Sequence, residues 1–158
     1  MIKIFLKTVP GSSSFWYNKK KEVYSWINYH LDNNNERPTF FLTLSCAEYK
    51  WPGVERLIKQ RMVIAGKDPN SFHQSVSKHV NQYSIVVQEY FQERVKLWLQ
   101  TVGRKVSRIQ HHWLHYEFAP SRGKLHAQML VISDRKYIKI LEDHIEANPL
   151  HKAAILSG

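Results

Sequence analysis

Apolar residues recur at helical spacing most clearly within residues 82–102, and Gly103 follows this stretch as a stop signal. The apolar stripe of this predicted helix is formed by Ile85, Phe91, Val95, Trp98, Leu99 and Val102. Three more helices are expected where an apolar face combines with an end signal, at residues 12–31, 52–65 and 135–147. Residues 67–80 are predicted to be a loop or a short helical piece.

Alternating apolar and polar residues, rich in β-branched and aromatic types, predict extended strands. The predicted strands are residues 39–45, 110–118 and 125–132, together with a short strand at residues 2–6. In the strand at residues 39–45, Phe41, Thr43 and Ser45 are expected to share one face. The last two strands are joined by the segment APSRGK and are expected to pair as a hairpin. Because helices and strands interleave, the pattern predicts an α+β fold, with a central antiparallel or mixed β-sheet and helices packed on it.

The size and composition of the chain indicate one folded domain, residues 1–158, with enough apolar and aromatic residues to form a core. Its formal net charge of +10 favours a polyanionic partner, and nucleic acid is the commonest of these. A basic surface without a specific partner explains the same charge. The charge alone therefore does not decide between these two interpretations.

The single cysteine, Cys46, excludes an internal disulfide and a zinc site built from cysteines, and it fits a reducing compartment. No apolar run is long enough to span a membrane, and the apolar start of the chain is too short for a convincing signal peptide. We therefore expect a nuclear protein, cytosolic before import, that is not secreted.

Polar side chains with the chemistry of metal ligands gather on one face of the predicted hairpin. Strand alternation places His115 and Glu117 on one face of the first strand. It places His126 and Gln128 on one face of the second. If residues 119–124 form the turn, Glu117 lies opposite His126, with Cβ atoms about 5 Å apart. His115 then lies opposite Gln128. The other face of both strands is apolar and is expected to be buried.

Carboxylate, carboxamide and imidazole groups together suit a hard or borderline divalent cation such as Mg²⁺ or Mn²⁺. No cysteine takes part in this cluster, so structural zinc is not expected there. The alternative interpretation is that His126 and Gln128 are ordinary polar residues on a solvated sheet face, because patterns of two residues are weak signals.

Four segments, in order along the chain, carry a family likeness. Residues 9–27 contain an aromatic pair and a following helix, and residues 37–52 contain an apolar strand that ends in Thr-Leu-Ser with a tryptophan soon after. Residues 86–102 form the long predicted helix. Residues 115–132 (HYEFAPSRGKLHAQMLVI) contain a Glu-Phe segment, an Arg-Gly turn and a His-hydrophobic-Gln pair. Together they resemble the N-terminal domain of Helitron transposases, and the likeness implies the RRM-like architecture of the HUH, or rolling-circle replication-initiator, endonucleases.

This resemblance assigns roles to the hairpin residues. In the family, two histidines bind a divalent ion together with an acidic or polar residue from a neighbouring strand. His126 occupies the first histidine position, and Gln128 stands where the family has the second. An amide oxygen at that position is a suitable ligand for Mg²⁺ or Mn²⁺. The resemblance makes Glu117 the third ligand. His115 stands where the family often has arginine, and it is assigned as a fourth ligand, a phosphate contact or a partner that orients Glu117.

The reaction implied by the resemblance is the nicking and joining of single-stranded DNA. A tyrosine hydroxyl attacks the scissile phosphate and leaves a 5′-phosphotyrosine and a free 3′-OH. Family enzymes carry this tyrosine on a helix well downstream of the paired motif. Tyr137 is the one tyrosine after Gln128 and is the candidate nucleophile, although its surroundings favour packing or DNA contact. We interpret the chain as a fragment of a larger multidomain transposase, which binds metal and DNA without its nucleophile segment.

Basic residues supply candidate DNA contacts. Arg122 and Lys124 lie beside the metal motif, where they can hold phosphates. Further candidates on predicted helices or at their ends are Lys19, Lys20, Arg104 and Lys105. A solvated helix face, or the favourable dipole at a helix C-terminus, explains these four equally well. Trp16, Tyr17 and Trp51 can stack on bases or pack into the core.

Two other function classes remain open. The first is a DNA- or RNA-binding module that has lost catalysis, with Gln128 as the sign of that loss. The second is a protein-interaction domain of a larger assembly, which predicts no salt-dependent binding to single-stranded oligonucleotides. Helitron-like proteins carry a helicase farther along the chain, so the resemblance implies a helicase domain as a partner beside single-stranded DNA.

Overall fold

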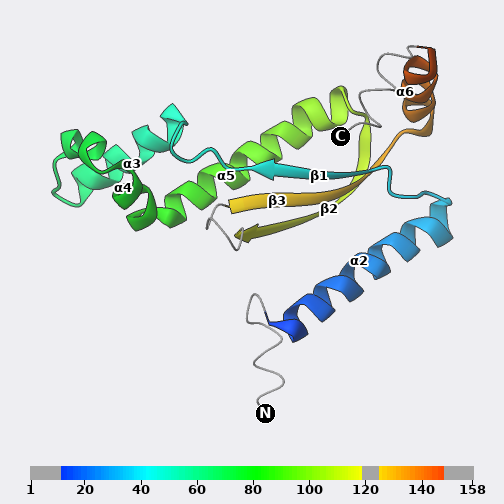
Figure 1. Ribbon diagram of the computed structural model, residues 1–158, viewed down its shortest axis with the longest axis horizontal. Coiled ribbons are helices and arrows are strands. Elements are labelled where there is room, and N and C mark those ends of the chain that lie inside the picture. Colours follow the sequence, from blue (N-terminus) through cyan, green and yellow to red (C-terminus); the bar gives the residue numbers. More distant parts are fainter. Residues whose placement is uncertain (1–11, 119–124, 148–158) are drawn as a thin grey trace. The chain divides into compact units, whose positions relative to one another are not determined.

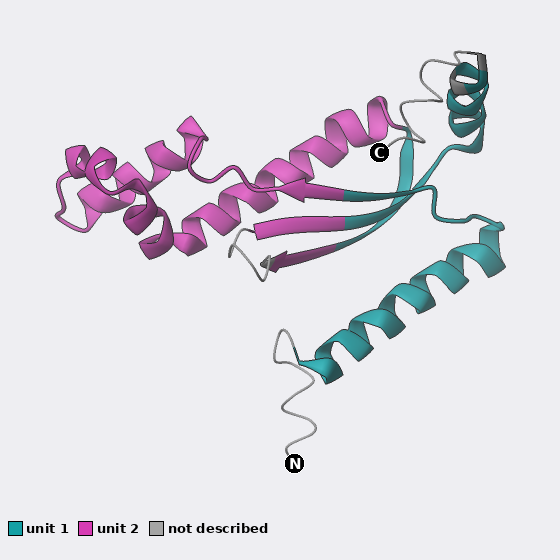
Figure 2. Ribbon diagram, viewed as in Figure 1, with its two compact units in different colours: residues 1–42, 108–114, 129–158 teal, residues 43–107, 115–128 magenta. Residues whose placement is uncertain are grey.

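The computed structural model describes residues 12–118 and 125–147, so the short strand expected at residues 2–6 lies outside the described residues. The chain divides into two compact units (Figure 2). Unit 1 comprises residues 1–42, 108–114 and 129–158, and unit 2 comprises residues 43–107 and 115–128. All three strands of the sheet pass through both units.

The strands form one sheet in the order β1-β3-β2 (Figure 1). They are β1 (Phe40–Ser45), β2 (Ile109–Phe118) and β3 (Leu125–Ser133). The N–H of Thr39 donates to the carbonyl of Val131 at 2.8 Å, and the N–H of Cys46 donates to the carbonyl of Leu125 at 2.9 Å, so β1 runs antiparallel to β3. The hairpin adds β2 antiparallel on the other side of β3. The predicted α+β architecture is confirmed.

The central strand β3 has a buried face and a more accessible face, as its alternating sequence predicts. Over residues 125–131 the buried side chains are Leu125, Ala127, Met129 and Val131, and the half-buried ones between them are His126, Gln128 and Leu130. At the end of the strand this alternation stops, because Ile132 and Ser133 are both buried. Burial of the apolar face removes it from water and stabilises the sheet. The polar residues His126 and Gln128 are therefore held on the face opposite the core.

Unit 1 contains the helices α2 (Ser13–Asn34) and α6 (Arg135–Ala147), close to their predicted ranges. The side chain of Ser12 accepts a hydrogen bond from the N–H of Phe15 at 3.1 Å and caps the start of α2. Asp134 caps α6 in a similar way, because its carboxylate accepts the N–H of Lys136 at 2.8 Å. At the other end of α2, Asn35 adopts the left-handed conformation with a φ of 51°.

Helix α2 packs on β2 within unit 1. The indole Nε1 of Trp113 donates a hydrogen bond to the carboxylate of Glu22 at 2.9 Å. Near the end of α2, the rings of His30 and His111 lie with their centroids 4.4 Å apart. Of the residues of α2, all of which the structure describes, only His30 is buried. The buried residue of this helix therefore has an ionisable side chain, the imidazole of His30.

Unit 2 contains most of the remaining helices: α3 (Pro52–Ile64), the 3₁₀-helix η1 (Pro69–Gln74), α4 (Val76–Gln82), α5 (Ser84–Trp98) and the π-helical turn η2 (Leu99–Gly103). The loop or short helical piece predicted at residues 67–80 corresponds to η1 and α4. The ring of Phe91 in α5 meets the ring of Tyr116 in β2 edge-on, so α5 packs on the apolar face of this part of the sheet. No helix in the described part of the chain is long and apolar enough to cross a membrane.

The apolar stripe predicted for residues 82–102 is wrong at two positions. Val87, Phe91 and Val95 are buried at a spacing of four, whereas Ile85 is 71% exposed and Val102 is 40% exposed. Ile85 lies two residues before Val87 and therefore about 200° around the helix from it. Val102 lies in the π-helical turn, which inserts an extra residue and shifts the helical phase.

Candidate functional site

Glu117 and Gln128 are in contact across the hairpin within unit 2. The amide Nε2 of Gln128 donates a hydrogen bond to Oε1 of Glu117, and both side chains are half-buried. The register expected from the sequence places Glu117 opposite His126. In the structure Glu117 contacts Gln128, which is the next residue on that face of β3. Alternation along the two strands is sufficient to bring these side chains to the same face.

His126 is held from the other side by β1. Its Nδ1 atom lies 3.1 Å from Oγ of Ser45, at hydrogen-bond distance. Ser45 shares the predicted strand face of Thr43, but no sequence motif marks it as a site residue. It is the last residue of the Thr-Leu-Ser segment, and its contact depends on the pairing of β1 with β3. Sequence alternation alone does not predict that pairing.

Two hydrogen-bonded pairs, Ser45–His126 and Glu117–Gln128, lie in unit 2, and strand alternation puts His126 and Gln128 on the same face of β3. We refer to these four side chains as the sheet-face cluster. Their hydrogen bonds use Nδ1 of His126, Oε1 of Glu117 and Nε2 of Gln128. The atoms that remain to bind a cation are Nε2 of His126, Oε2 of Glu117 and Oε1 of Gln128. One nitrogen and two oxygen donors fit a hard or borderline ion such as Mg²⁺ or Mn²⁺.

His115 is half-buried on β2, two residues before Glu117. Within the described residues, one group of at least three histidine or acidic side chains is close enough to share an ion, and it does not include His115, Glu117 or His126. A ligand role for His115 therefore stays a prediction, and the sheet-face cluster depends on the carboxamide of Gln128 for its third donor.

Tyr137 lies in the first turn of α6, where its N–H donates to the carboxylate of Asp134 at 3.2 Å. It is half-buried and belongs to unit 1, whereas the sheet-face cluster belongs to unit 2. Its role as nucleophile stays a prediction. Tyr116 is adjacent to Glu117 in sequence but packs on Phe91 on the core side. Burial, helped by the charge of Glu93, raises the pKa of Tyr116 above its ordinary value, so its hydroxyl stays protonated to higher pH.

The candidate DNA contacts differ in how free their charges are. Arg122 and Lys124 lie outside the described residues. Arg104 and Lys105 are exposed directly after the π-helical turn η2. On α2, Lys19 forms an ion pair with Glu22 at 2.7 Å, and Lys20 lies 5.7 Å from the ring centre of Tyr24. Arg104 and Lys105 are therefore the better placed of the described candidates for a phosphate backbone.

The aromatic candidates also separate. Trp16 and Tyr17 are exposed, at 45% and 59%. Trp51 packs against Tyr90 and Phe91, and the guanidinium of Arg94 lies 5.3 Å above its ring. Trp51, Phe91 and Arg94 line a cavity of about 250 Å³ in unit 2, which also reaches Ser45 at the end of β1. An indole with an arginine above it beside an open cavity is suited to stack on a base.

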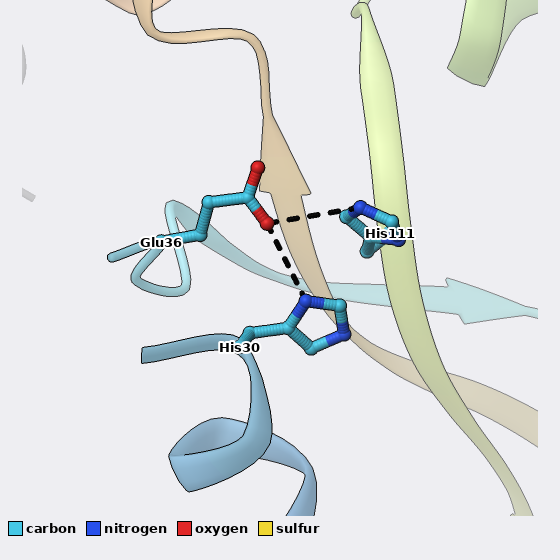
Figure 3. A group of neighbouring side chains, drawn as sticks. All are labelled: His30, Glu36 and His111. Atoms are coloured by element: carbon cyan, nitrogen blue, oxygen red, sulfur yellow. Dashed lines mark ion pairs between the residues drawn. The ribbon is translucent and has the colours of Figure 1, made fainter. Parts of the chain in front are cut away.

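A second polar cluster, which the sequence analysis did not predict, lies in unit 1 (Figure 3). It consists of His30, Glu36 and His111, and we refer to it as the His–Glu–His cluster. The carboxylate of Glu36 lies between the two imidazoles, 3.4 Å from His30 and 3.7 Å from His111. One local sequence signal accompanies it: Asn35 ends helix α2, with His30 five residues before it and Glu36 directly after it.

No curated protein and no solved structure shows significant similarity to the chain. One family model, described as the Helitron helicase-like domain at the N-terminus, matches residues 1–131. The match includes β1, β2, most of β3 and all four residues of the sheet-face cluster. Because it spans well over half of the sequence, the chain belongs to the family of Helitron helicase-like N-terminal domains.

Proposed function

We propose that this domain nicks and rejoins single-stranded DNA in a reaction that depends on a divalent metal ion, as the DNA-processing part of a Helitron-like transposase. Its family supports a role related to Helitron transposition. The observation that carries the finer proposal is the sheet-face cluster. Carboxylate, imidazole and carboxamide side chains from β2 and β3 meet there on the face opposite the core.

Glu117, His126 and Gln128 are the proposed ligands of Mg²⁺ or Mn²⁺. When bound, such an ion polarises the scissile phosphate and aligns it for in-line attack. Gln128 contributes its amide oxygen, because its amide nitrogen is already engaged by Glu117. The same hydrogen bond fixes the orientation of the carboxamide and keeps the two side chains together on the sheet.

Ser45 is proposed to position His126. An imidazole that binds a cation through Nε2 needs its proton on Nδ1, because a nitrogen that carries a proton has no free lone pair. Oγ of Ser45 lies 3.1 Å from Nδ1 and can accept that N–H, which selects the required tautomer. Ser45 is therefore a positioning residue, and it acts on the metal site through His126.

The chemical step forms a bond between a tyrosine oxygen and phosphorus and breaks the bond from phosphorus to the 3′ oxygen. The proton of the hydroxyl is lost, the 3′ oxygen takes up a proton, and the 5′ end stays on the protein as a phosphotyrosine. Tyr137 is the candidate within this chain. Arg104 and Lys105 are the proposed phosphate contacts among the described residues. We also propose that the chain acts beside a helicase domain and that the protein is nuclear.

A second candidate function is a single-stranded DNA-binding module without catalysis. One observation favours it: Gln128 stands where the resemblance places a histidine, and its amide donates a hydrogen bond to Glu117. This bond stabilises both side chains on the sheet face. This module binds the strand through basic and aromatic side chains and leaves it intact.

The test combines metal binding with cleavage. Mn²⁺ is titrated into the full chain by calorimetry, and a labelled single-stranded DNA pool is incubated with the protein and Mn²⁺ and analysed for a covalent adduct. We expect Glu117→Ala and His126→Ala to abolish both metal binding and adduct formation. Gln110→Ala, an exposed glutamine on the same hairpin, serves as the matched control and leaves both unchanged.

The outcomes separate the two candidates. An adduct that is lost in Tyr137→Phe supports nicking by this chain, and an adduct that persists in this variant assigns the nucleophile to another tyrosine. Salt-sensitive binding of the strand with neither Mn²⁺ binding nor an adduct supports the binding module, because a fragment that lacks only its nucleophile still binds Mn²⁺. Equal Mn²⁺ binding by the parent protein, Glu117→Ala and His126→Ala contradicts the metal site.

A further inference from the structure

The His–Glu–His cluster in unit 1 joins the end of α2 and the segment directly after it to β2, which is far away in the sequence. His30 lies near the end of α2, Glu36 follows that helix, and His111 lies near the start of β2 (Figure 3). The carboxylate oxygen Oε2 of Glu36 is the shared neighbour of Nδ1 of His30 and Nε2 of His111. The three ligand atoms all lie within 4.8 Å of one another.

The end of α2 explains why His30 and Glu36 meet. The left-handed Asn35 closes the helix, its N–H donates to the carbonyl of Leu31, and the N–H of Glu36 donates to the carbonyl of His30 at 3.1 Å. The bond from Asn35 to Leu31 is that of an αL cap. The bond from Glu36 to His30 brings those two residues together. An apolar contact is usual at these positions. Here the two side chains are an imidazole and a carboxylate.

Burial makes this cluster more than a surface ion pair. His30 is only 5% exposed, and its Nδ1 atom has no hydrogen-bond partner among the described residues. Buried polar atoms without a hydrogen bond are rare in proteins, and a bound water or ion is the usual explanation for them. Glu36 is held in place by Asn34, whose amide nitrogen donates to Oε2 at 3.2 Å. One imidazole nitrogen is therefore buried, unsatisfied and aimed at a fixed carboxylate.

The spacing of the donor atoms matches a small transition-metal ion. Tetrahedral zinc with ligand distances of about 2.0–2.1 Å separates its donor atoms by about 3.4 Å. The two nitrogen-to-oxygen separations in the cluster are 3.4 Å and 3.7 Å. Two imidazoles and one carboxylate are a donor set that zinc prefers over Mg²⁺. The side chain of His111 is 44% exposed and Glu36 also lines a cavity of about 510 Å³, so an ion can enter from solvent.

We propose that His30, Glu36 and His111 form a zinc-binding site, separate from the sheet-face cluster. Three protein ligands leave the fourth position to water. The ion stabilises unit 1, because it ties the end of α2 and the segment that follows to β2. The site is independent of the proposed nicking reaction, since no residue is shared between the two clusters.

The experiment uses the full chain with Glu117 and His126 both replaced by alanine, so that binding at the sheet-face cluster cannot contribute. After treatment with a chelator, Zn²⁺ is titrated by calorimetry, native mass spectrometry gives the stoichiometry, and Co²⁺ serves as a spectroscopic probe of nitrogen ligation. We expect one Zn²⁺ per chain, together with a rise in Tm on binding. His111→Ala, at a half-exposed position, and Glu36→Gln should each weaken binding about tenfold or more.

His73→Ala is the matched control. His73 also faces a carboxylate, with its Nε2 atom 3.2 Å from Glu55, but it lies in no group of three such side chains within the described residues. This variant should bind Zn²⁺ as tightly as its parent. The proposal is overturned if the parent binds no Zn²⁺, or if His111→Ala and Glu36→Gln bind it as tightly as the parent and show the same rise in Tm.

Discussion

Gln128 donates a hydrogen bond through Nε2 to the carboxylate of Glu117, which spans the two strands of the hairpin. The bond engages the amide nitrogen and one carboxylate oxygen, so the amide oxygen and the second carboxylate oxygen are the donors suited to a cation. The glutamine is therefore more than a weakened substitute for histidine. It gives the cluster a harder set of donor atoms, and this difference can be measured.

Replacement of Gln128 by histidine should change the metal preference of the sheet-face cluster. A second imidazole favours softer ions, and Glu117 can accept its other N–H, so the ratio of Zn²⁺ to Mn²⁺ affinity should rise about tenfold. Calorimetry measures this ratio, with His111→Ala in the background to remove the other cluster. Gln110→His on the exposed part of β2 is the control. A ratio equal to that of the parent would contradict the assignment of Gln128 as a ligand.

Ser45→Ala tests the positioning of His126. Loss of the acceptor for Nδ1 releases the imidazole tautomer and should weaken Mn²⁺ binding by about 10- to 100-fold. Ser45 is exposed, so the fold should be retained, and circular dichroism checks this. Thr43→Ala, on the same face of the same strand and also exposed, should leave Mn²⁺ affinity unchanged. Equal losses in both variants would mean that the strand, rather than the hydrogen bond, is responsible.

Met129→Ala should show how strongly the buried face of β3 holds the sheet. Met129 is 0% exposed, and removal of its side chain leaves a cavity that costs about 3 kcal/mol of unfolding free energy. Leu130→Ala, on the half-buried face, should cost clearly less. Urea unfolding measures both values. A larger loss for Leu130→Ala than for Met129→Ala would reverse our assignment of the two faces.

Asn35 tests the cap that brings His30 and Glu36 together. Its φ of 51° suits glycine, so Asn35→Gly should keep or slightly raise the unfolding free energy. Asn35→Ala should cost about 1 kcal/mol, because alanine lacks the short polar side chain whose local hydrogen bonds let asparagine adopt the left-handed conformation. It should also weaken Zn²⁺ binding. The control is Asn33→Ala within the helix, where no loss of stability is expected, and urea unfolding compares the three variants.

Tyr116 gives the protein a pH dependence on the alkaline side. Its pKa in the folded state is raised above 10.0, first by burial and then by Glu93. A raised pKa means that the stabilising contribution is complete below the unfolded value and is lost as the pH rises through the folded value. Tyr116→Phe should therefore lose less unfolding free energy than the parent above about pH 10. Tyr29→Phe, at a 62% exposed position, should follow the parent. If Tyr116→Phe also loses as much unfolding free energy as the parent, the phenol of Tyr116 is not the cause of the alkaline pH dependence.

The sequence alone was sufficient for features that depend on neighbours in the chain. Alternation along residues 125–131 predicted which face of β3 is buried, and Ser12 marked the start of α2. The contact between Glu117 and Gln128 also follows from a short hairpin, because the two residues are only 11 positions apart and share a face. Local backbone geometry determines each of these features, and residue type and spacing in turn determine local backbone geometry.

Only the tertiary structure decided which distant segments meet. Ser45 reaches His126 because β1 pairs with β3, and His111 reaches His30 and Glu36 because α2 packs on β2. The exposure of Val102 depends on a π-helical turn that the apolar spacing did not reveal. The order of strands and the packing of helices depend on the total apolar area buried across the chain. No single segment carries that information, so both long-range contacts became visible only in the folded protein.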